Sequence, residues 1–186
     1  MRGKLIVVSG PSGVGKDTVV SEYIKRNSNT YLSVSCTSRA PREGEVDGVN
    51  YIFLSREEFE ERISNGDFLE YAEYNGNYYG TPKYKMEEEL EKGKDVILVI
   101  EVQGALKVKD LIPDALFIFI LPPSISTLKE RLIGRGTDSP ESIEGRINTA
   151  LKEIEVSDRY DYNIVNDDLN MAVLELENII KKEKTE

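Results

Sequence analysis

One glycine-rich stretch near the start of the chain limits the folds that it can adopt. An apolar run, residues 5–8, leads into Gly10-Pro11-Ser12-Gly13-Val14-Gly15-Lys16-Asp17-Thr18, and a helical pattern follows. Between a strand and a helix, such glycines let several backbone N–H groups turn inward and form a concavity for an anion. The amino end of the helix adds its positive dipole end. The stretch therefore predicts a phosphate-binding loop, with Lys16 on the outer phosphates.

The loop departs from the strict motif at one position. In that motif Ser or Thr directly follows the lysine and places a hydroxyl on magnesium, whereas here Asp17 stands before Thr18. The alternative for the whole stretch is a glycine-rich turn between strand and helix that binds nothing. The glycines and the lysine all stand at the required positions, which favours the phosphate-binding interpretation.

The overall composition excludes several classes of function. With 186 residues, 39% of them hydrophobic and 31% charged, the chain suits one domain with a substantial core. Its net charge of −10 argues against duplex DNA or an anionic membrane as the main partner. The absence of histidine rules out histidine bases and histidine-based zinc sites. Cys36 is the single cysteine, and the first apolar run is too short for a signal peptide or membrane span, so we expect a cytoplasmic protein.

Buried strands alternate with helices over most of the chain. Apolar runs at 4–9, 96–100 and 116–121 and a short strand at 163–166 are separated by helical patterns at 15–27, 82–93, 125–134 and 140–156, before a last helix whose tail, 181–186, is expected to fray. This alternation predicts an α/β fold with a parallel sheet and a ligand site at the carboxyl ends of its strands. There, Glu101 could hold magnesium through water, accept from an amino group, or cap the next helix.

One region breaks this alternation. Strands are expected at 50–54, 68–74 and 77–81, and Ser55 with Glu58 forms a capping box that opens a helix at about 56–65. The last two strands are joined by an Asn75-Gly76 turn. We expect a small antiparallel sheet with one helix, inserted into the α/β core. The next helix is expected to have Thr81 as its cap and Pro82 in its first turn.

A loop over residues 35–45 is a candidate phosphate site. Arg39 and Arg42 are spaced so that both guanidinium groups could hold one anion by bidentate hydrogen bonds. A solvated surface loop with salt bridges to Glu43 and Glu45 fits the same stretch equally well.

A second group of arginines brackets the glycine-containing turn at 131–140. Arg131, Arg135 and Arg146 could close over a transferring phosphoryl group, or pair with the neighbouring Glu130, Glu141 and Glu144. Two phosphate sites facing each other imply transfer between two phosphorylated molecules. The acceptor phosphate is already ionised near neutral pH, so no general base is needed. Positioning and charge neutralisation by magnesium, lysine and arginine would then carry the chemistry.

In their order and spacing, several motifs resemble the guanylate kinase family from end to end. They are Gly10 to Lys16, Ser35, Thr37 to Arg42, Gly44-Glu45, Gly48 to Tyr51, Phe68 to Glu70, Gly76 to Thr81, Gln103-Gly104, Arg135-Gly136 and Ile164 to Asp167. The resemblance implies a three-layer phosphate-loop sandwich with an inserted mixed α/β subdomain and a short helical lid. It also implies an enzyme, monomeric or homodimeric, that uses Mg²⁺ and transfers the terminal phosphoryl group of ATP to GMP, and to dGMP, in purine nucleotide metabolism and GMP recycling.

The resemblance assigns roles to residues of this sequence. The catalytic set comprises Lys16, Arg39, Arg135 and Arg146. ATP would be bound by Gly10, Pro11, Ser12, Gly13, Val14, Gly15, Lys16, Asp17, Thr18, Arg131 and Asn166. GMP would be bound through guanine by Glu70, Ser35 and Thr81, through phosphate by Arg39, Arg42, Tyr51 and Tyr79, and also by Glu101. Mg²⁺ would be held through phosphates and water, with Asp17, Thr18 and Glu101 as candidate ligands.

The same resemblance divides the single domain, 1–186, into three parts. The core comprises 1–34, 82–134 and 157–186, the GMP-binding insertion 35–81, and the lid 135–156. Two positions depart from the family, since relatives usually have Gly or Ser in place of Asp17 and Asp in place of Glu101. A non-catalytic interaction module of the same fold, or a same-fold kinase with a different phosphorylated acceptor, are the alternatives.

Overall fold

A five-stranded parallel sheet lies at the centre of the computed structural model, which describes residues 2–74, 76–134 and 140–185. Its strands, in spatial order, are β2 (Thr30–Leu32), β7 (Asp95–Val99), β1 (Leu5–Ser9), β8 (Leu116–Leu121) and β9 (Tyr162–Val165). All neighbouring strands run parallel. The three central strands are almost entirely buried, as continuous apolar runs covered on both faces should be.

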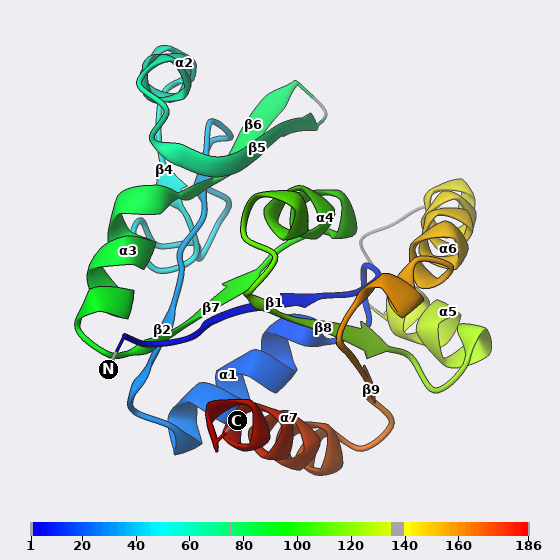
Figure 1. Cartoon of the computed structure of the whole chain (residues 1–186). Coiled ribbons are helices and arrows are strands. Elements are labelled where there is room, and N and C mark those ends of the chain that lie inside the picture. Colours follow the sequence, from blue (N-terminus) through cyan, green and yellow to red (C-terminus); the bar gives the residue numbers. More distant parts are fainter. Residues whose placement is uncertain (1, 75, 135–139, 186) are drawn as a thin grey trace.

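Helices cover both faces of this sheet (Figure 1). The helices α1 (Lys16–Arg26) and α7 (Leu169–Thr185) lie on one face, and α3 (Lys83–Glu91) and α4 (Val102–Leu111) on the other. Because side chains alternate along a strand, Ile6 packs with the first pair of helices and Val7 with the second. The predicted three-layer α/β architecture is therefore confirmed.

A second, four-stranded sheet stands apart from the first, in the order β4 (Ile52–Phe53), β3 (Cys36–Thr37), β6 (Asn77–Pro82) and β5 (Phe68–Tyr74). It is mixed, because β3 and β4 run parallel, so the expectation of an antiparallel sheet is wrong for that pair. The helix α2 (Arg56–Ser64) packs on it through Phe59, whose ring stacks on Phe68 at 4.3 Å between centroids. The predicted capping box of Ser55 and Glu58 is present.

The start of α3 differs from the sequence expectation. Thr81 lies in β6 and caps no helix, because its hydroxyl donates to Glu70 instead. Pro82 takes the N-cap position, and no side chain caps the helix.

Two further helices pack on each other beside the glycine-rich loop. They are α5 (Ile125–Gly134), capped by Ser124, and α6 (Pro140–Ile154), followed by a 3₁₀ turn at Ser157–Arg159. Leu128 and Leu132 of α5 meet Ile143 of α6. Leu132 also reaches the loop, since a Cβ on Gly13 would lie 2.8 Å from its Cδ2 atom.

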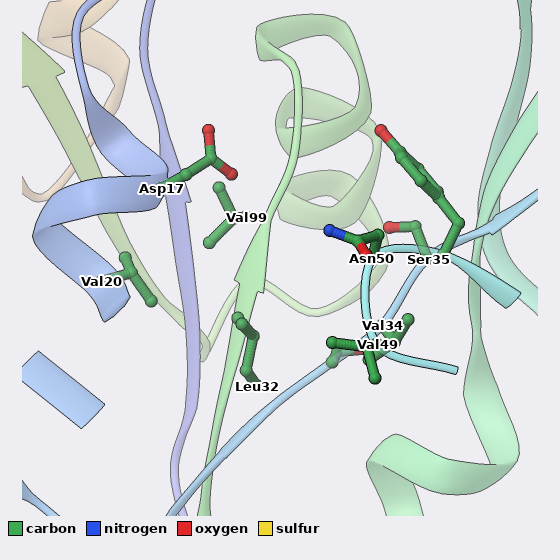
Figure 2. Close-up of a pocket in the computed structure, with 10 residues that line it drawn as sticks. Asp17, Val20, Leu32, Val34, Ser35, Val49, Asn50 and Val99 are labelled. Carbon is green, nitrogen blue, oxygen red and sulfur yellow. The ribbon is translucent and has the colours of Figure 1, made fainter. Parts of the chain in front are cut away.

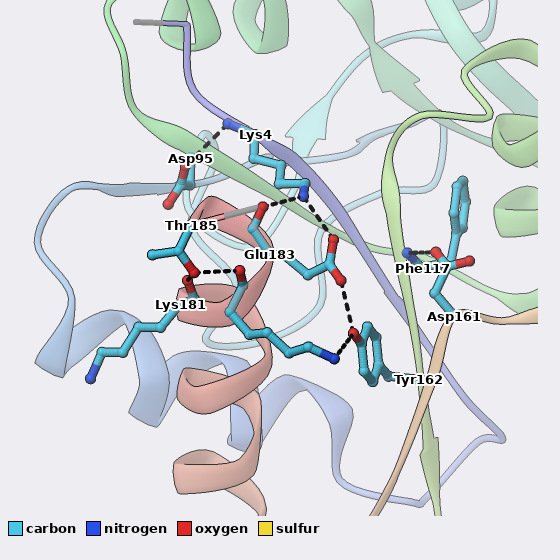
Figure 3. Close-up of polar contacts among 9 residues, drawn as sticks. Lys4, Asp95, Phe117, Asp161, Tyr162, Lys181, Glu183 and Thr185 are labelled. Carbon is cyan, nitrogen blue, oxygen red and sulfur yellow. Dashed lines mark hydrogen bonds and ion pairs between the residues drawn. The ribbon is translucent and has the colours of Figure 1, made fainter.

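The carboxyl end of α7 is tied to the sheet rather than frayed, contrary to expectation (Figure 3). The Nζ atom of Lys4 donates to the backbone oxygen of Glu183 at 2.7 Å and to its carboxylate at 2.9 Å. Lys184 donates to Asp95 at 2.8 Å, and Tyr162 donates to Glu183 at 2.8 Å. Among the described residues, no helix is long and apolar enough to cross a membrane.

Candidate active site

The glycine-rich stretch forms the turn between β1 and α1, and its glycines are required by the geometry. Gly15 is the N-cap of α1 with φ of 92°, a left-handed conformation that side chains disfavour. A Cβ on Gly15 would lie 2.7 Å from Nδ2 of Asn166, and a Cβ on Gly10 would lie 2.5 Å from the backbone oxygen of Ile120. The loop is thus held too closely by its neighbours for any side chain at these two positions.

Two side chains support this loop, one from α5 and one from the residue that follows β9. The buried Asn166 donates from Nδ2 to the backbone oxygen of Val14 at 2.8 Å. Arg131 of α5 donates to the same oxygen at 3.2 Å and to the backbone oxygen of Asn166 at 2.9 Å. Arg131 therefore binds backbone carbonyls rather than neighbouring glutamates, and it fixes the loop to β9.

The loop lysine is buried beside a carboxylate. Lys16 is 8% exposed, and its Nζ atom donates to the backbone oxygen of Gly10 at 3.3 Å. The same atom lies 3.6 Å from Oε1 of Glu101. Glu101 occupies the N-cap position of α4 but makes no capping hydrogen bond, so its side chain faces the loop lysine instead of the helix.

A third charged group from α6 belongs to this site. Glu153 is half-buried, and burial raises its pKa to about 7, with repulsion from Glu101 adding to the rise and Lys16 opposing it. The sequence pattern gave no indication of this residue, because only the packing of α6 brings it toward the loop.

A cluster in the second sheet is built around a guanidinium group. Arg39 pairs bidentately with Glu45, at 2.9 Å for each of two contacts. Its guanidinium carbon lies 5.4 Å from the ring centroid of Tyr51, which meets the ring of Tyr79 edge-on at 6.1 Å. Hydrogen bonds from Arg39 and from the backbone N–H of Arg42 lower the pKa of Glu45 to about 2. The Arg42 side chain is exposed beside this cluster.

Of the two sequence interpretations of the loop 35–45, the salt bridge is confirmed for Glu45, and the phosphate site stays a prediction. Glu45 is the salt-bridge partner that the alternative anticipated, while Arg39 with Tyr51 and Tyr79 forms a compact group of hydrogen-bond donors. The carboxylate of Glu45 shows that this guanidinium binds a planar anion at both nitrogens.

A partly buried carboxylate lies between the two sheets. Oε1 of Glu70 accepts from the Thr81 hydroxyl at 2.7 Å, across the β5–β6 pair. Burial raises the pKa of Glu70, and the hydrogen bond from Thr81 opposes that rise. A Cβ on Gly104 would lie 3.0 Å from the Oε2 atom of Glu70, so α4 approaches this carboxylate closely.

The first turn of α4 joins the two parts of the site. At its N-cap, Glu101 faces Lys16 of the phosphate loop. At Gly104, one turn later, the helix faces Glu70 of the second sheet. One short helical segment thus separates the glycine-rich loop from a carboxylate that can accept two parallel hydrogen bonds.

The comparisons with known proteins agree with this arrangement. The family model for guanylate kinase matches residues 2–183. The chain belongs to the guanylate kinase family.

Proteins named guanylate kinase in several bacteria are similar along almost the whole chain. One from Streptococcus thermophilus is 57% identical over 183 residues, which is 98% of this chain and 88% of that protein. One from Clostridium perfringens is 54% identical over 183 residues, covering 98% of this chain and 85% of that protein. The crystal structure of guanylate kinase from Anaplasma phagocytophilum superposes with a TM-score of 0.82 at 36% identity, covering all of this chain and 88% of that one.

The fold extends beyond the guanylate kinase family. A shikimate kinase from Bacteroides thetaiotaomicron has a TM-score of 0.55 at 14% identity, which shows a shared fold and nothing more.

Not every residue expected from the guanylate kinase resemblance lies in one described cluster. Arg135 lies outside the described residues. Arg146 lies on α6 and is half-buried. Asp17 and Thr18 are exposed in the first turn of α1. Asp17 lines a pocket with Ser35 and Tyr51, and thus faces the second sheet (Figure 2).

Proposed function

We propose that this chain transfers the terminal phosphoryl group of ATP to GMP, giving ADP and GDP. The observation that carries the proposal is the first turn of α4, which has Lys16 at one end and Glu70 at the other. The triphosphate of the donor, bound at the loop, and the nucleobase of the acceptor, bound at Glu70, would then lie on either side of the first turn of α4. The names of the similar proteins support the same reaction.

The choice of guanine follows from the chemistry of Glu70. An ionised carboxylate accepts two hydrogen bonds and donates none. The guanine edge offers N1–H and the 2-amino group as adjacent donors, which adenine does not. Thr81 fixes the orientation of the carboxylate by its 2.7 Å hydrogen bond. Ser35, in the segment that joins β2 to β3, would add a hydroxyl.

The acceptor phosphate is proposed to displace Glu45 from Arg39. The guanidinium already holds a carboxylate at both nitrogens, and a phosphate offers the same planar pair of oxygens with more charge. Tyr51 and Tyr79 would add phenolic donors, and Arg42 a second guanidinium from solvent.

On the donor side, backbone N–H groups of residues 12–15 and the Lys16 ammonium would hold the phosphates of ATP. Arg131 and Asn166 would keep the loop in shape, and Arg146 with Arg135 would approach from the lid. The reaction then needs alignment and charge neutralisation, and no side chain has to remove a proton.

The residues present fit a magnesium ion held mainly by substrate. The described residues contain no group of three acidic, cysteine or histidine side chains that could hold a metal. Mg²⁺ commonly keeps several waters and binds one or two carboxylates together with substrate phosphates. Glu101 and the Thr18 hydroxyl could serve in this way, and the ion would neutralise charge between the donor phosphates.

We also propose that the chain works as a core with two moving parts. Residues 35–81 would carry the acceptor and 135–156 would act as the lid, closing to exclude water that would otherwise accept the phosphoryl group. dGMP would serve as a second acceptor.

A coupled ADP-release assay tests the function, with ATP, Mg²⁺ and in turn GMP, AMP, UMP or CMP. Turnover with GMP alone is expected in the wild type, and Glu70→Gln should lose about a hundredfold in kcat/KM, since its amide cannot accept both hydrogen bonds. Glu73→Gln, an exposed change on the same strand, is the matched control. Equal turnover of several acceptors would indicate a less selective kinase, and none in folded protein would indicate a binding module.

A further inference from the structure

A small pocket opens between α1 and the chain segments that lead into the second sheet (Figure 2). Its volume is about 130 Å³. Figure 2 shows Asp17 on one side and Asn50 with Ser35 on the other. The apolar part of its lining consists of Val20, Leu32, Val34, Val49 and Val99. The polar part consists of Asp17, Ser33, Ser35, Asn50 and Tyr51.

The polar side chains of this pocket have unused hydrogen-bonding capacity. Within the described part of the chain, the Asp17 carboxylate and the Ser35 hydroxyl have no hydrogen-bond or ion-pair partner. Asn50 accepts from the backbone N–H of Val46 at 2.9 Å through Oδ1, which leaves its amide hydrogens for another acceptor. Asp17 also lies near enough to Tyr51 to raise the pKa of that phenol, after burial and Tyr79.

The position of the pocket suggests which part of a ligand would enter it. Tyr51 belongs to the cluster proposed for the acceptor phosphate, and Ser35 to the proposed base pocket. In a nucleoside monophosphate, the group that joins phosphate to base is the sugar. A pentose has apolar ring carbons and hydroxyl groups at its edge, which matches an apolar lining with a few polar groups.

We propose that Asp17 reads the sugar of the acceptor nucleotide, its carboxylate accepting a hydrogen bond from a ribose hydroxyl. Carboxylates bind ribose hydroxyls in this manner in other nucleotide-binding folds. The proposal rests on the proposed function, since it assumes a nucleotide acceptor. It makes Asp17 a specificity residue on the acceptor side, not a magnesium ligand on the donor side.

Sugar-modified acceptors test this assignment. We would measure kcat/KM for GMP, 2′-deoxy-GMP and 3′-deoxy-GMP in the wild type, in Asp17→Ala and in a control variant. The control is Asp110→Ala, which removes the same charge from an exposed position at the far end of α4. The wild type and the control should prefer GMP over at least one deoxy acceptor by about tenfold, the range for a charge-assisted hydrogen bond. In Asp17→Ala that preference should fall to about twofold.

Two results would overturn the proposal. One is an unchanged preference among the three acceptors in Asp17→Ala. The other is a change confined to the KM for ATP or to the magnesium requirement, which would place Asp17 on the donor side. If the wild type does not phosphorylate GMP at all, the proposed function fails instead. Kd values of the three nucleotides, measured by calorimetry without ATP, would then still test Asp17. The ratio of the Kd values for GMP and for each deoxy nucleotide would be compared between the wild type and Asp17→Ala.

Discussion

The carboxylate of Glu101 lies 3.6 Å from the ammonium of Lys16, although Glu101 is exposed and the lysine is buried. A carboxylate in this position supplies the negative charge that a buried ammonium needs when no phosphate is bound. It also lies where a cation associated with the donor phosphates would approach. The pair shows Glu101 as a partner of Lys16, and the role proposed for Glu101 as an oxygen ligand of magnesium is open to a separate test.

Replacing Glu101 with Gln should separate these roles. We expect the magnesium concentration for half-maximal rate to rise about 10- to 100-fold, as when a supporting ligand of a metal site is lost. Glu101→Asp, which keeps the charge, should stay within a few-fold of the wild type. The measurement is a magnesium titration of kcat at saturating ATP and GMP. An unchanged magnesium dependence in Glu101→Gln would leave Glu101 only its role beside Lys16.

Replacing Gly104 with Ala should damage acceptor binding without damaging the fold. The added methyl would lie 3.0 Å from Oε2 of Glu70, so the carboxylate must shift away from its present position. We expect kcat/KM for GMP to fall about tenfold, while the KM for ATP stays unchanged. The helix itself should gain up to about 1 kcal/mol from the replacement of glycine.

Gly145 provides the matched control for that change. A Cβ there would meet nothing within 4 Å, and the residue also lies inside a helix. Gly145→Ala should therefore gain helix stability in urea unfolding and keep kcat/KM for GMP. If both variants lost activity equally, crowding of Glu70 would not be the cause.

Much of this site could be predicted from the sequence because its signals are local. The phosphate loop depends on glycine spacing between an apolar strand and a helix. The pairing of Glu70 with Thr81, which the structure shows, could also have been found, because a two-residue Asn75-Gly76 turn predicts a register in which these two residues lie opposite each other. The resemblance to the guanylate kinase family assigned both residues to the base pocket without this contact.

Other contacts had no local signal. Asn166 reaches the backbone of Val14 across 152 positions of sequence. Glu153 comes within electrostatic range of Lys16 only because of the way α6 packs, and helix docking is set by the whole apolar face rather than by one residue. The parallel pairing of β3 with β4 was likewise missed, because strands of two residues carry too little alternation to show their direction.

The pH dependence of GMP use should report Glu70. Its pKa is raised by burial, so the carboxylate becomes protonated, and unable to accept both guanine donors, at a higher pH than an exposed glutamate. The acid limb of kcat/KM for GMP reports ionisations of the free enzyme and its free substrate. Thr81→Val removes the hydrogen bond that lowers this pKa, so the limb should move to still higher pH. If the acid limb lay at the same pH in the wild type and in Thr81→Val, it would report the ionisation of a group other than Glu70.

Removing the loop support should weaken donor binding specifically. Asn166→Ala leaves the backbone oxygen of Val14 with one partner, Arg131, instead of two. We expect a stability loss of about 0.5–1.5 kcal/mol, the net contribution of one intramolecular hydrogen bond. The KM for ATP should rise severalfold while the KM for GMP stays constant, as steady-state kinetics would show. Asn166→Asp keeps the size but loses the donor, so its KM for ATP should rise as well.

The ion pair of Arg39 and Glu45 should have opposite effects on stability and on acceptor binding. The folded pKa of Glu45 is about 2, below its usual value, so the pair stabilises the fold above the unfolded pKa and is lost as the pH falls toward 2. Glu45→Gln should therefore be less stable than the wild type near neutral pH and equally stable near pH 2. It should also bind GMP more tightly, because the phosphate no longer competes with a carboxylate for Arg39.

Chemical unfolding across pH and calorimetric titration with GMP measure the two effects. Glu43→Gln, an exposed charge-matched change in the same loop, is the control and should show neither the loss of stability nor the tighter binding of GMP. Weaker GMP binding in Glu45→Gln would mean that Glu45 orients Arg39 for phosphate instead of blocking it.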